Sequence, residues 1–126
     1  MSLTLSFLRD TYAVCQLPAD AAPPAWAFEG EFWSVTRAAG ELSVVCLEAN
    51  VPDGVKAEKD WAVLRLHGPF EFTLTGILAS VLEPLKVAGI GIFALSTFDT
   101  DYVLVSEANA DDAAEALRAA GHTVRE

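Results

Sequence analysis

The chain has 126 residues, of which 52% are hydrophobic, so it can fill one core of ordinary size and we expect a folded globular protein. Its 18 acidic and 8 basic residues give a formal net charge of −10. This surplus argues against nucleic acid and anionic membrane surfaces as partners, because both are negatively charged.

The N-terminal segment gives no sign of a secretory signal. No basic residue precedes its apolar residues, and Arg9 and Asp10 interrupt them. The stretch 76–95 is long enough to suggest a membrane helix, but Glu83 and Lys86 lie near its centre, where charges are most costly. We therefore predict a helix followed by a strand here, with no membrane partner, and a cytoplasmic protein.

The cysteines and histidines do not form a recognisable ligand set. Cys15 and Cys46 lie in apolar runs and lack Cys-x-x-Cys spacing, so we interpret them as small core residues in a reducing cytoplasm. His67 lies next to Gly68 and is a candidate ligand contact, although a solitary histidine is more often structural, as we expect for His122. We predict no metal site and no cofactor.

The first half of the chain predicts short strands. The runs 3–8 and 12–17 are apolar, and three residues separate them, which favours a hairpin. The prolines of 18–24 predict a loop. The runs 32–36 and 42–47 then predict a second strand pair.

The second half begins with a strand and a helix. The strand is predicted at 61–66, and Thr75 is a plausible N-cap for the helix that follows. The apolar residues of 77–85 recur at three- and four-residue spacing, which is typical of a helix with one buried face. Pro84 lies inside this pattern and removes a backbone hydrogen bond, so we predict a bend or a split near Glu83.

Two further strands and a helix complete this half. The runs 90–95 and 102–105 predict paired strands around the polar turn 96–101. A helix with a buried alanine and leucine stripe is predicted between Asn109 and Gly121, and a last strand at 122–124. The order is βαββαβ, which is that of an α+β ferredoxin-like fold.

An internal repeat relates the two halves. Residues 12–17, YAVCQL, align with 61–66, WAVLRL, at an offset of 49 (61 − 12). The tripeptide Glu-Ala-Asn occurs at 48–50 and again at 107–109, an offset of 59 (107 − 48). A chance match of short apolar strands is the alternative, but two identical tripeptides after equivalent strands favour a tandem duplication.

We accordingly predict two domains. Residues 1–60 are expected to form a degenerate copy that lacks its first helix, because a proline-rich loop stands in its place. Residues 61–126 are expected to form the complete copy.

Several motifs carry a resemblance to a known family. Gly68-Pro69-Phe70, Thr75-Gly76-Ile77-Leu78-Ala79 and Ser96-Thr97-Phe98-Asp99-Thr100-Asp101-Tyr102 resemble the ACT domain. The chain is most similar to small stand-alone bacterial ACT-like proteins, which are related to aspartate kinase regulatory domains and to the cytosolic arginine sensors of animals. The resemblance implies a ferredoxin-like ACT fold and a regulatory function, with an amino acid bound at an interface between ACT domains. We also expect a homodimer, formed by sheet or helix pairing, and a regulated protein as a further partner.

The residues themselves offer the chemistry of an amino-acid site. An amino acid needs backbone N–H donors for its carboxylate and acceptors for its ammonium. The start of the helix supplies the donors, and Gly76 lets a ligand approach the backbone closely. Asp99 and Asp101 can accept from an ammonium or from a cationic side chain, such as that of arginine or lysine. The predicted ligand-binding residues are Phe72, Thr73, Leu74, Thr75, Gly76, Ile77, Ser96, Thr97, Phe98, Asp99 and Asp101.

Each of these residues also has a structural interpretation, as a helix cap, a turn residue or a core aromatic. In the βαββαβ order, moreover, the loop before the helix and the turn 96–101 can lie at opposite ends of a domain. A site would then have to be assembled across an interface between copies or chains.

The sequence does not indicate an enzyme. It has no nucleophile elbow and no phosphate-binding glycine loop. We therefore predict a non-catalytic module. The alternative is a protein–protein interaction or dimerisation module that pairs through a sheet edge or helix face and has no small-molecule ligand.

Overall fold

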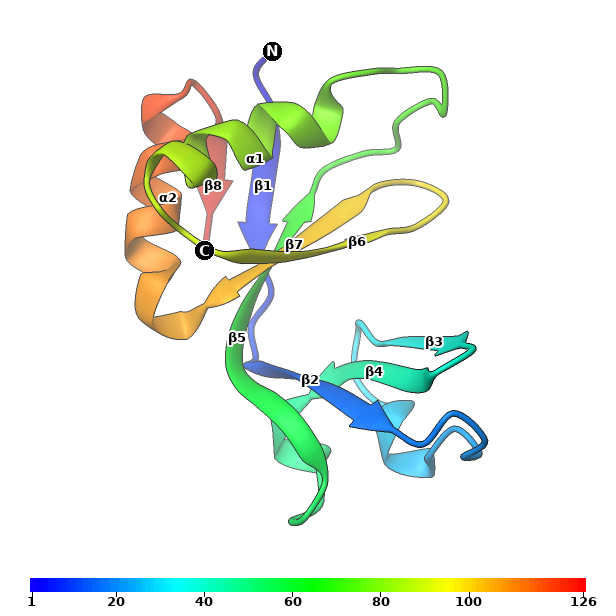
Figure 1. The fold of residues 1–126 in the computed structure, drawn as a ribbon. Coiled ribbons are helices and arrows are strands. Elements are labelled where there is room, and N and C mark those ends of the chain that lie inside the picture. Colours follow the sequence, from blue (N-terminus) through cyan, green and yellow to red (C-terminus); the bar gives the residue numbers. More distant parts are fainter. The chain divides into compact units, whose positions relative to one another are not determined.

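The structure, a computed structural model, describes residues 1–126 and divides into two compact units (Figure 1). The strand unit is Asp10–Trp61, and the helical unit combines Met1–Arg9 with Ala62–Glu126. We expected a division between residues 60 and 61. The observed division differs because the first nine residues belong to the same unit as the second half of the chain.

The strand unit is built from antiparallel strands. Strand β4 pairs with β3 on one side and with β2 on the other, and β2 also pairs with the first half of β5. Cys15 and Cys46 are buried in its core and are not bonded to each other, which confirms their interpretation as core residues. The strands are β2 (Tyr12–Leu17), β3 (Ser34–Ala38), β4 (Glu41–Leu47) and β5 (Lys56–Leu66).

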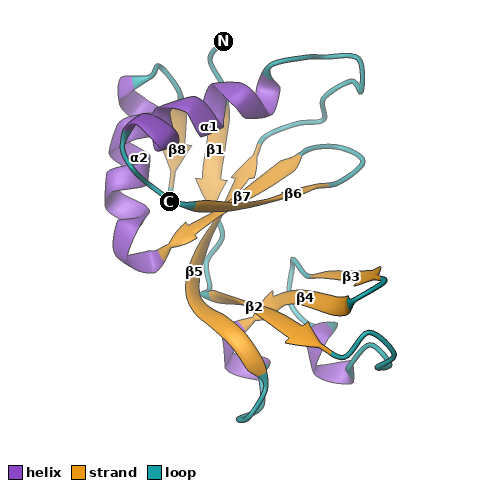
Figure 2. Ribbon diagram, in the orientation of Figure 1, coloured by secondary structure: helices purple, strands orange, loops and turns teal.

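The strand unit has no α-helix, and the short purple coils drawn in it in Figure 2 are 3-10 turns. It contains two 3-10 turns, η1 (Ala25–Ala27) in the proline-rich stretch and η2 (Glu48–Asn50) after β4. The second copy of Glu-Ala-Asn forms the equivalent turn η3 (Glu107–Asn109), and the residue before each turn has φ −56°. This likeness supports the duplication, which stays a prediction. The first unit lacks both helices, whereas we expected only the first to be missing.

The helical unit contains a sheet in the order β6-β7-β5-β1-β8. Strand β1 is antiparallel to β5 and parallel to β8. The elements are β1 (Thr4–Phe7), α1 (Ile77–Val87), β6 (Ile92–Ser96), β7 (Asp101–Ser106), α2 (Ala110–Ala119) and β8 (Thr123–Arg125). The βαββαβ segment therefore accepts a fifth strand from the N-terminus.

The predicted hairpin between 3–8 and 12–17 is wrong, because β1 and β2 do not pair. Leu5 instead lies between Leu66 and Val124 in the register of the sheet and is fully buried. Both of its neighbours face the same core, so burial of Leu5 favours this central position over a local hairpin.

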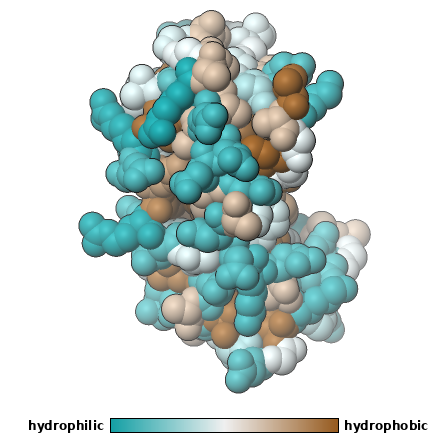
Figure 3. All heavy atoms as spheres, turned by 90° about the vertical axis from the view of Figure 1, so that its left-hand side faces the viewer, coloured by the Kyte–Doolittle hydropathy of each residue, from teal (hydrophilic) through white to brown (hydrophobic).

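The core of the helical unit lies between the sheet and its helices. Ile77, Val81 and Leu85 from α1 meet Ala113 and Leu117 from α2 and the apolar residues of one sheet face. The side on which α2 lies is mostly hydrophilic, with hydrophobic atoms in small separate patches (Figure 3). Neither helix has the length and apolar character that a membrane span requires.

Helix α1 differs from the prediction at its first turn and at Pro84. The residue before it is Gly76, in a left-handed conformation (φ 80°, ψ 0°), and no side chain caps the helix, so the N-cap role predicted for Thr75 is wrong. The helix continues through Pro84 to Val87 without the split that we considered near Glu83.

Candidate functional site

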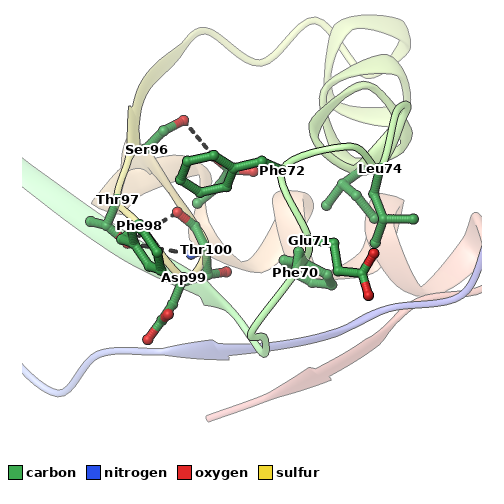
Figure 4. Close-up of a pocket in the computed structure, with 11 residues that line it drawn as sticks. Phe70, Glu71, Phe72, Leu74, Ser96, Thr97, Phe98, Asp99 and Thr100 are labelled. Atoms are coloured by element: carbon green, nitrogen blue, oxygen red, sulfur yellow. Dashed lines mark hydrogen bonds between the residues drawn. The ribbon is translucent and has the colours of Figure 1, made fainter.

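A pocket of about 370 Å³ lies between two connections of the helical unit (Figure 4). One is the loop from β5 to α1, and the other is the turn from β6 to β7. Its lining residues are Phe70, Glu71, Phe72, Leu74, Ile77, Ser96, Thr97, Phe98, Asp99, Thr100 and Asp101.

Hydrogen bonds hold the loop against the turn. The Phe70 N–H donates to the Asp99 carbonyl at 2.8 Å, and the Thr100 hydroxyl donates to the Leu66 carbonyl at 2.7 Å. Strand β7 begins where β5 ends and pairs with it. The possibility that loop and turn lie at opposite ends of the domain is therefore not realised, and one domain brings both to the same pocket.

Gly68 allows this close approach. A Cβ atom at residue 68 would lie 2.8 Å from the Asp99 carbonyl oxygen and 3.2 Å from the Thr100 Cβ. The first distance is shorter than a nonbonded carbon–oxygen contact, and the obstacle is backbone. Gly68 therefore determines how tightly the loop can approach the turn.

Hydrogen bonds within the turn fix its conformation. The Thr97 N–H donates to the Thr100 carbonyl at 2.8 Å, and the Ser96 hydroxyl donates to the Asp101 carboxylate. This bond orients Asp101 and leaves its other oxygen as an acceptor. The carboxylate of Asp99 forms no hydrogen bond in the structure, so both of its oxygens can accept.

Two aromatic rings meet at the pocket, Phe72 from the loop and Phe98 from the turn. Their centroids are 5.0 Å apart and their planes are inclined by 57°. Phe72 is 74% exposed and Phe98 is 79% exposed. Large apolar side chains that are this exposed and lie together mark a surface for a ligand or a partner.

All the charged side chains that line the pocket are acidic. Glu71, Asp99 and Asp101 contribute carboxylates, and no lysine, arginine or histidine lines the pocket. Carboxylates accept hydrogen bonds from ammonium and guanidinium groups, and aromatic faces attract cations. The lining can therefore hold a cation. No group of three or more histidine, cysteine, aspartate or glutamate side chains is arranged to hold a metal ion.

The structure brings most of the predicted ligand-binding residues to this pocket. Those that line it are Phe72, Leu74, Ile77, Ser96, Thr97, Phe98, Asp99 and Asp101. Thr73, Thr75 and Gly76 do not line it, nor does His67, and the space beside Gly76 is open. Phe70, Glu71 and Thr100 also line the pocket and are not among the predicted ligand-binding residues. The alternation Phe-Glu-Phe was the available signal for Glu71, whereas nothing in the sequence distinguishes Thr100.

The fold and pocket define an α+β protein of the ACT type, and comparison with known families agrees. The model of the ACT domain matches residues 56–119, and a second family model, for an N-terminal domain, matches residues 10–54. The chain belongs to the ACT domain family. Neither matching model describes a catalytic domain.

Solved structures place the chain among related proteins. Protein Atu0741 from Agobacterium tumefaciens is 42% identical, with a TM-score of 0.95 over 100% of this chain and 95% of that protein. Protein VC0802 from Vibrio cholerae is 18% identical, with a TM-score of 0.78 over 95% of this chain and 91% of that one. The ligand-free regulatory subunit of aspartate kinase from Thermus thermophilus is 12% identical, with a TM-score of 0.66 over 92% and 95%. The last two share the fold.

Proposed function

We propose that the protein is a non-catalytic, cytoplasmic regulatory module that binds a small amino acid or a related metabolite in the pocket between loop and turn. The observation that carries this proposal is the lining: exposed aromatic rings and carboxylates from two connections converge on one space. Membership of the ACT family supports it, because ACT domains are regulatory modules that bind small molecules.

The ligand that suits this lining has a cationic side chain. The lining has three carboxylates and no basic side chain, so it favours a ligand with a positive charge. A guanidinium or ammonium packed against an exposed face of Phe72 or Phe98 would gain about 0.5–2 kcal/mol from each ring that it faces. Arginine and lysine are the amino acids with such a group.

The start of α1 offers hydrogen-bond donors for the carboxylate of the ligand. The first N–H groups of a helix have no partner within it, and no side chain caps this one. Ile77, the first helical residue, also lines the pocket. These N–H groups and the positive end of the helix suit the carboxylate of an amino acid.

We also propose that the site lies at an interface between ACT domains of a homodimer. The exposure of Phe72 and Phe98 supports this arrangement, because a small ligand alone would leave much of both rings in water.

A thermal-shift screen against the twenty amino acids, followed by calorimetric titration, tests the proposal. A ligand bound only by the native state adds about 2.7 kcal/mol of stability at a hundred times its Kd. Asp99→Asn should remove the response, and Asp53→Asn, an exposed aspartate in the strand unit, is the matched control. A response that survives Asp99→Asn would place the ligand elsewhere.

The second candidate function is a protein interaction or dimerisation module without a small-molecule ligand. The exposed pair Phe72 and Phe98 favours it, because these rings can also form the centre of a protein interface. The absence of any thermal shift, together with a dimer that Phe98→Ser dissociates, would favour this function over the sensor.

A further inference from the structure

A second cluster lies away from the pocket, on the face of the helical unit's sheet that its helices do not cover. Leu5, Leu64 and Val124 face the helices. Side chains alternate along a strand, so their neighbours Ser6, Arg65 and Arg125 point to the opposite face.

The register aligns these residues in rows. Ser6 pairs with Arg65 of β5 on one side and with Arg125 of β8 on the other. In the adjacent row Thr4 pairs with Thr123, and the N–H of His67 donates to the Thr4 carbonyl at 2.8 Å. Adjacent strands lie about 4.8 Å apart, so the two arginine side chains start about 10 Å apart with the Ser6 hydroxyl between them.

The basic groups of this face have no counter-charge. Neither Arg65 nor Arg125 forms an ion pair or a side-chain hydrogen bond in the structure. The strand residues that share the face are Phe93, Leu95, Tyr102, Leu104, Val63, Thr4, Ser6 and Thr123, and none is acidic. Arg65 and Arg125 therefore lie in one row, on either side of Ser6, with no acidic strand residue beside them.

We propose that this face is a binding site for an oxyanion, namely the phosphate group of a small molecule, held between Arg65 and Arg125 above Ser6. Arginine binds phosphate oxygens through two parallel N–H bonds, and two such side chains can converge on one phosphate. The Ser6 hydroxyl lies 2.6 Å from His67 Nε2, so the imidazole orients this hydroxyl within the site. The site is separate from the pocket and does not depend on what the pocket binds.

The pKa of His67 can report whether an anion is bound between the arginines. Burial lowers the pKa of His67, and the positive charges of Arg65 and Arg125 lower it further. A dianion bound between the arginines would reverse the effect of those charges and raise the pKa of His67. A purely structural role for the arginines predicts no such rise.

Titration of the full-length protein with inorganic phosphate at constant ionic strength, followed by two-dimensional NMR, tests the proposal. We expect saturable shifts confined to Ser6, His67, Thr123 and their neighbours, with an increase in the pKa of His67. Arg65→Gln and Arg125→Gln should each weaken binding about tenfold or more. Lys86→Gln, which removes an exposed charge at the end of α1, is the charge-matched control and should bind as the natural chain does.

Three results would overturn the proposal. One is a response to phosphate that spreads over all basic residues and equals that to chloride. Another is binding that Arg65→Gln and Arg125→Gln both leave unchanged. The third is a saturable response to succinate with none to phosphate, which would assign the site to carboxylates. Because two arginines are tested separately, the misfolding of one variant leaves the other to decide.

Discussion

His122 completes a hydrogen bond that Pro84 cannot make. In a helix the N–H of residue 84 would donate to the carbonyl of Ser80, but proline has no N–H. His122 Nε2 lies 2.9 Å from that carbonyl oxygen, and its Nδ1 accepts from the N–H of Leu3 at 3.1 Å. Since the Leu3 N–H can only donate, the ring proton is on Nε2. One imidazole thus joins β1, α1 and the start of β8.

We expect His122→Ala to destabilise the protein by about 2–4 kcal/mol. His122 is only 5% exposed, and its loss leaves the buried N–H of Leu3 and the partly buried carbonyl of Ser80 without partners. Urea unfolding followed by circular dichroism measures the change. Removal of His67, which is more exposed, should cost much less, and similar losses for the two histidines would contradict the argument.

Gly68→Ala should disrupt the pocket more than the fold. The added Cβ would lie 2.8 Å from the Asp99 carbonyl oxygen, so the loop must move away from the turn and the bond from the Phe70 N–H must lengthen. We expect faster hydrogen exchange at Phe70 and at least tenfold weaker binding of any pocket ligand. Gly40→Ala is the control, because no atom lies within 4 Å of a Cβ at that position. An unchanged exchange rate at Phe70 would contradict the assigned role of Gly68.

The local elements could be predicted from the sequence, whereas the partner of β1 could not. The spacing of Ile77, Val81 and Leu85 predicts helix α1, and a run of polar residues predicts the turn between β6 and β7. The alternation of Leu5 with polar residues predicts a strand but not its neighbours in the sheet. Its partners Leu66 and Val124 are distant in sequence. Strand order depends on such long-range burial, which a local pattern does not contain.

The candidate site was predictable in part for the same reason. Phe98, Asp99 and Asp101 belong to a recognisable turn, so their proximity follows from local sequence. The loop that carries Glu71 and Phe72 meets this turn only because β7 begins beside the end of β5, and that arrangement follows from the order of the sheet.

The pKa of His67 should lie below the ordinary value for histidine, about 6.5. Burial is the larger cause, and the charges of Arg65 and Arg125 add to it. The unfolded chain then binds a proton at higher pH than the folded chain does, so this residue's contribution reduces stability as the pH falls below about 6.5. The reduction should be small, because solvent reaches the ring.

Proton NMR titration of the His67 ring measures this directly. Arg125→Gln should raise the pKa of His67 in the absence of added anions, and salt should have the same effect because it screens the arginine charges. A pKa that neither change moves would show that burial alone acts on the ring.

Phe72→Ser and Phe98→Ser should separate function from stability. Both rings are mostly exposed, so we expect each change to alter the free energy of unfolding by less than about 1 kcal/mol. The same variants should lose the response to a pocket ligand. Leu85→Ala is the contrast, since a fully buried leucine costs about 2–5 kcal/mol when truncated. A large loss of stability in Phe98→Ser would assign that ring to the core.

Pro84→Ala should rescue a protein that lacks His122. Alanine at position 84 restores an N–H that can donate to the Ser80 carbonyl, which is the group that His122→Ala leaves without a partner. In the natural chain this carbonyl already accepts from His122, so Pro84→Ala alone gains less from the restored donor. The two substitutions should therefore be non-additive, with the double variant more stable than the sum of the single changes by about 1 kcal/mol or more. The four proteins of this cycle, unfolded in urea under one condition, give the coupling energy. Strict additivity would mean that His122 and Pro84 stabilise the domain independently, and that the imidazole acts only through Leu3.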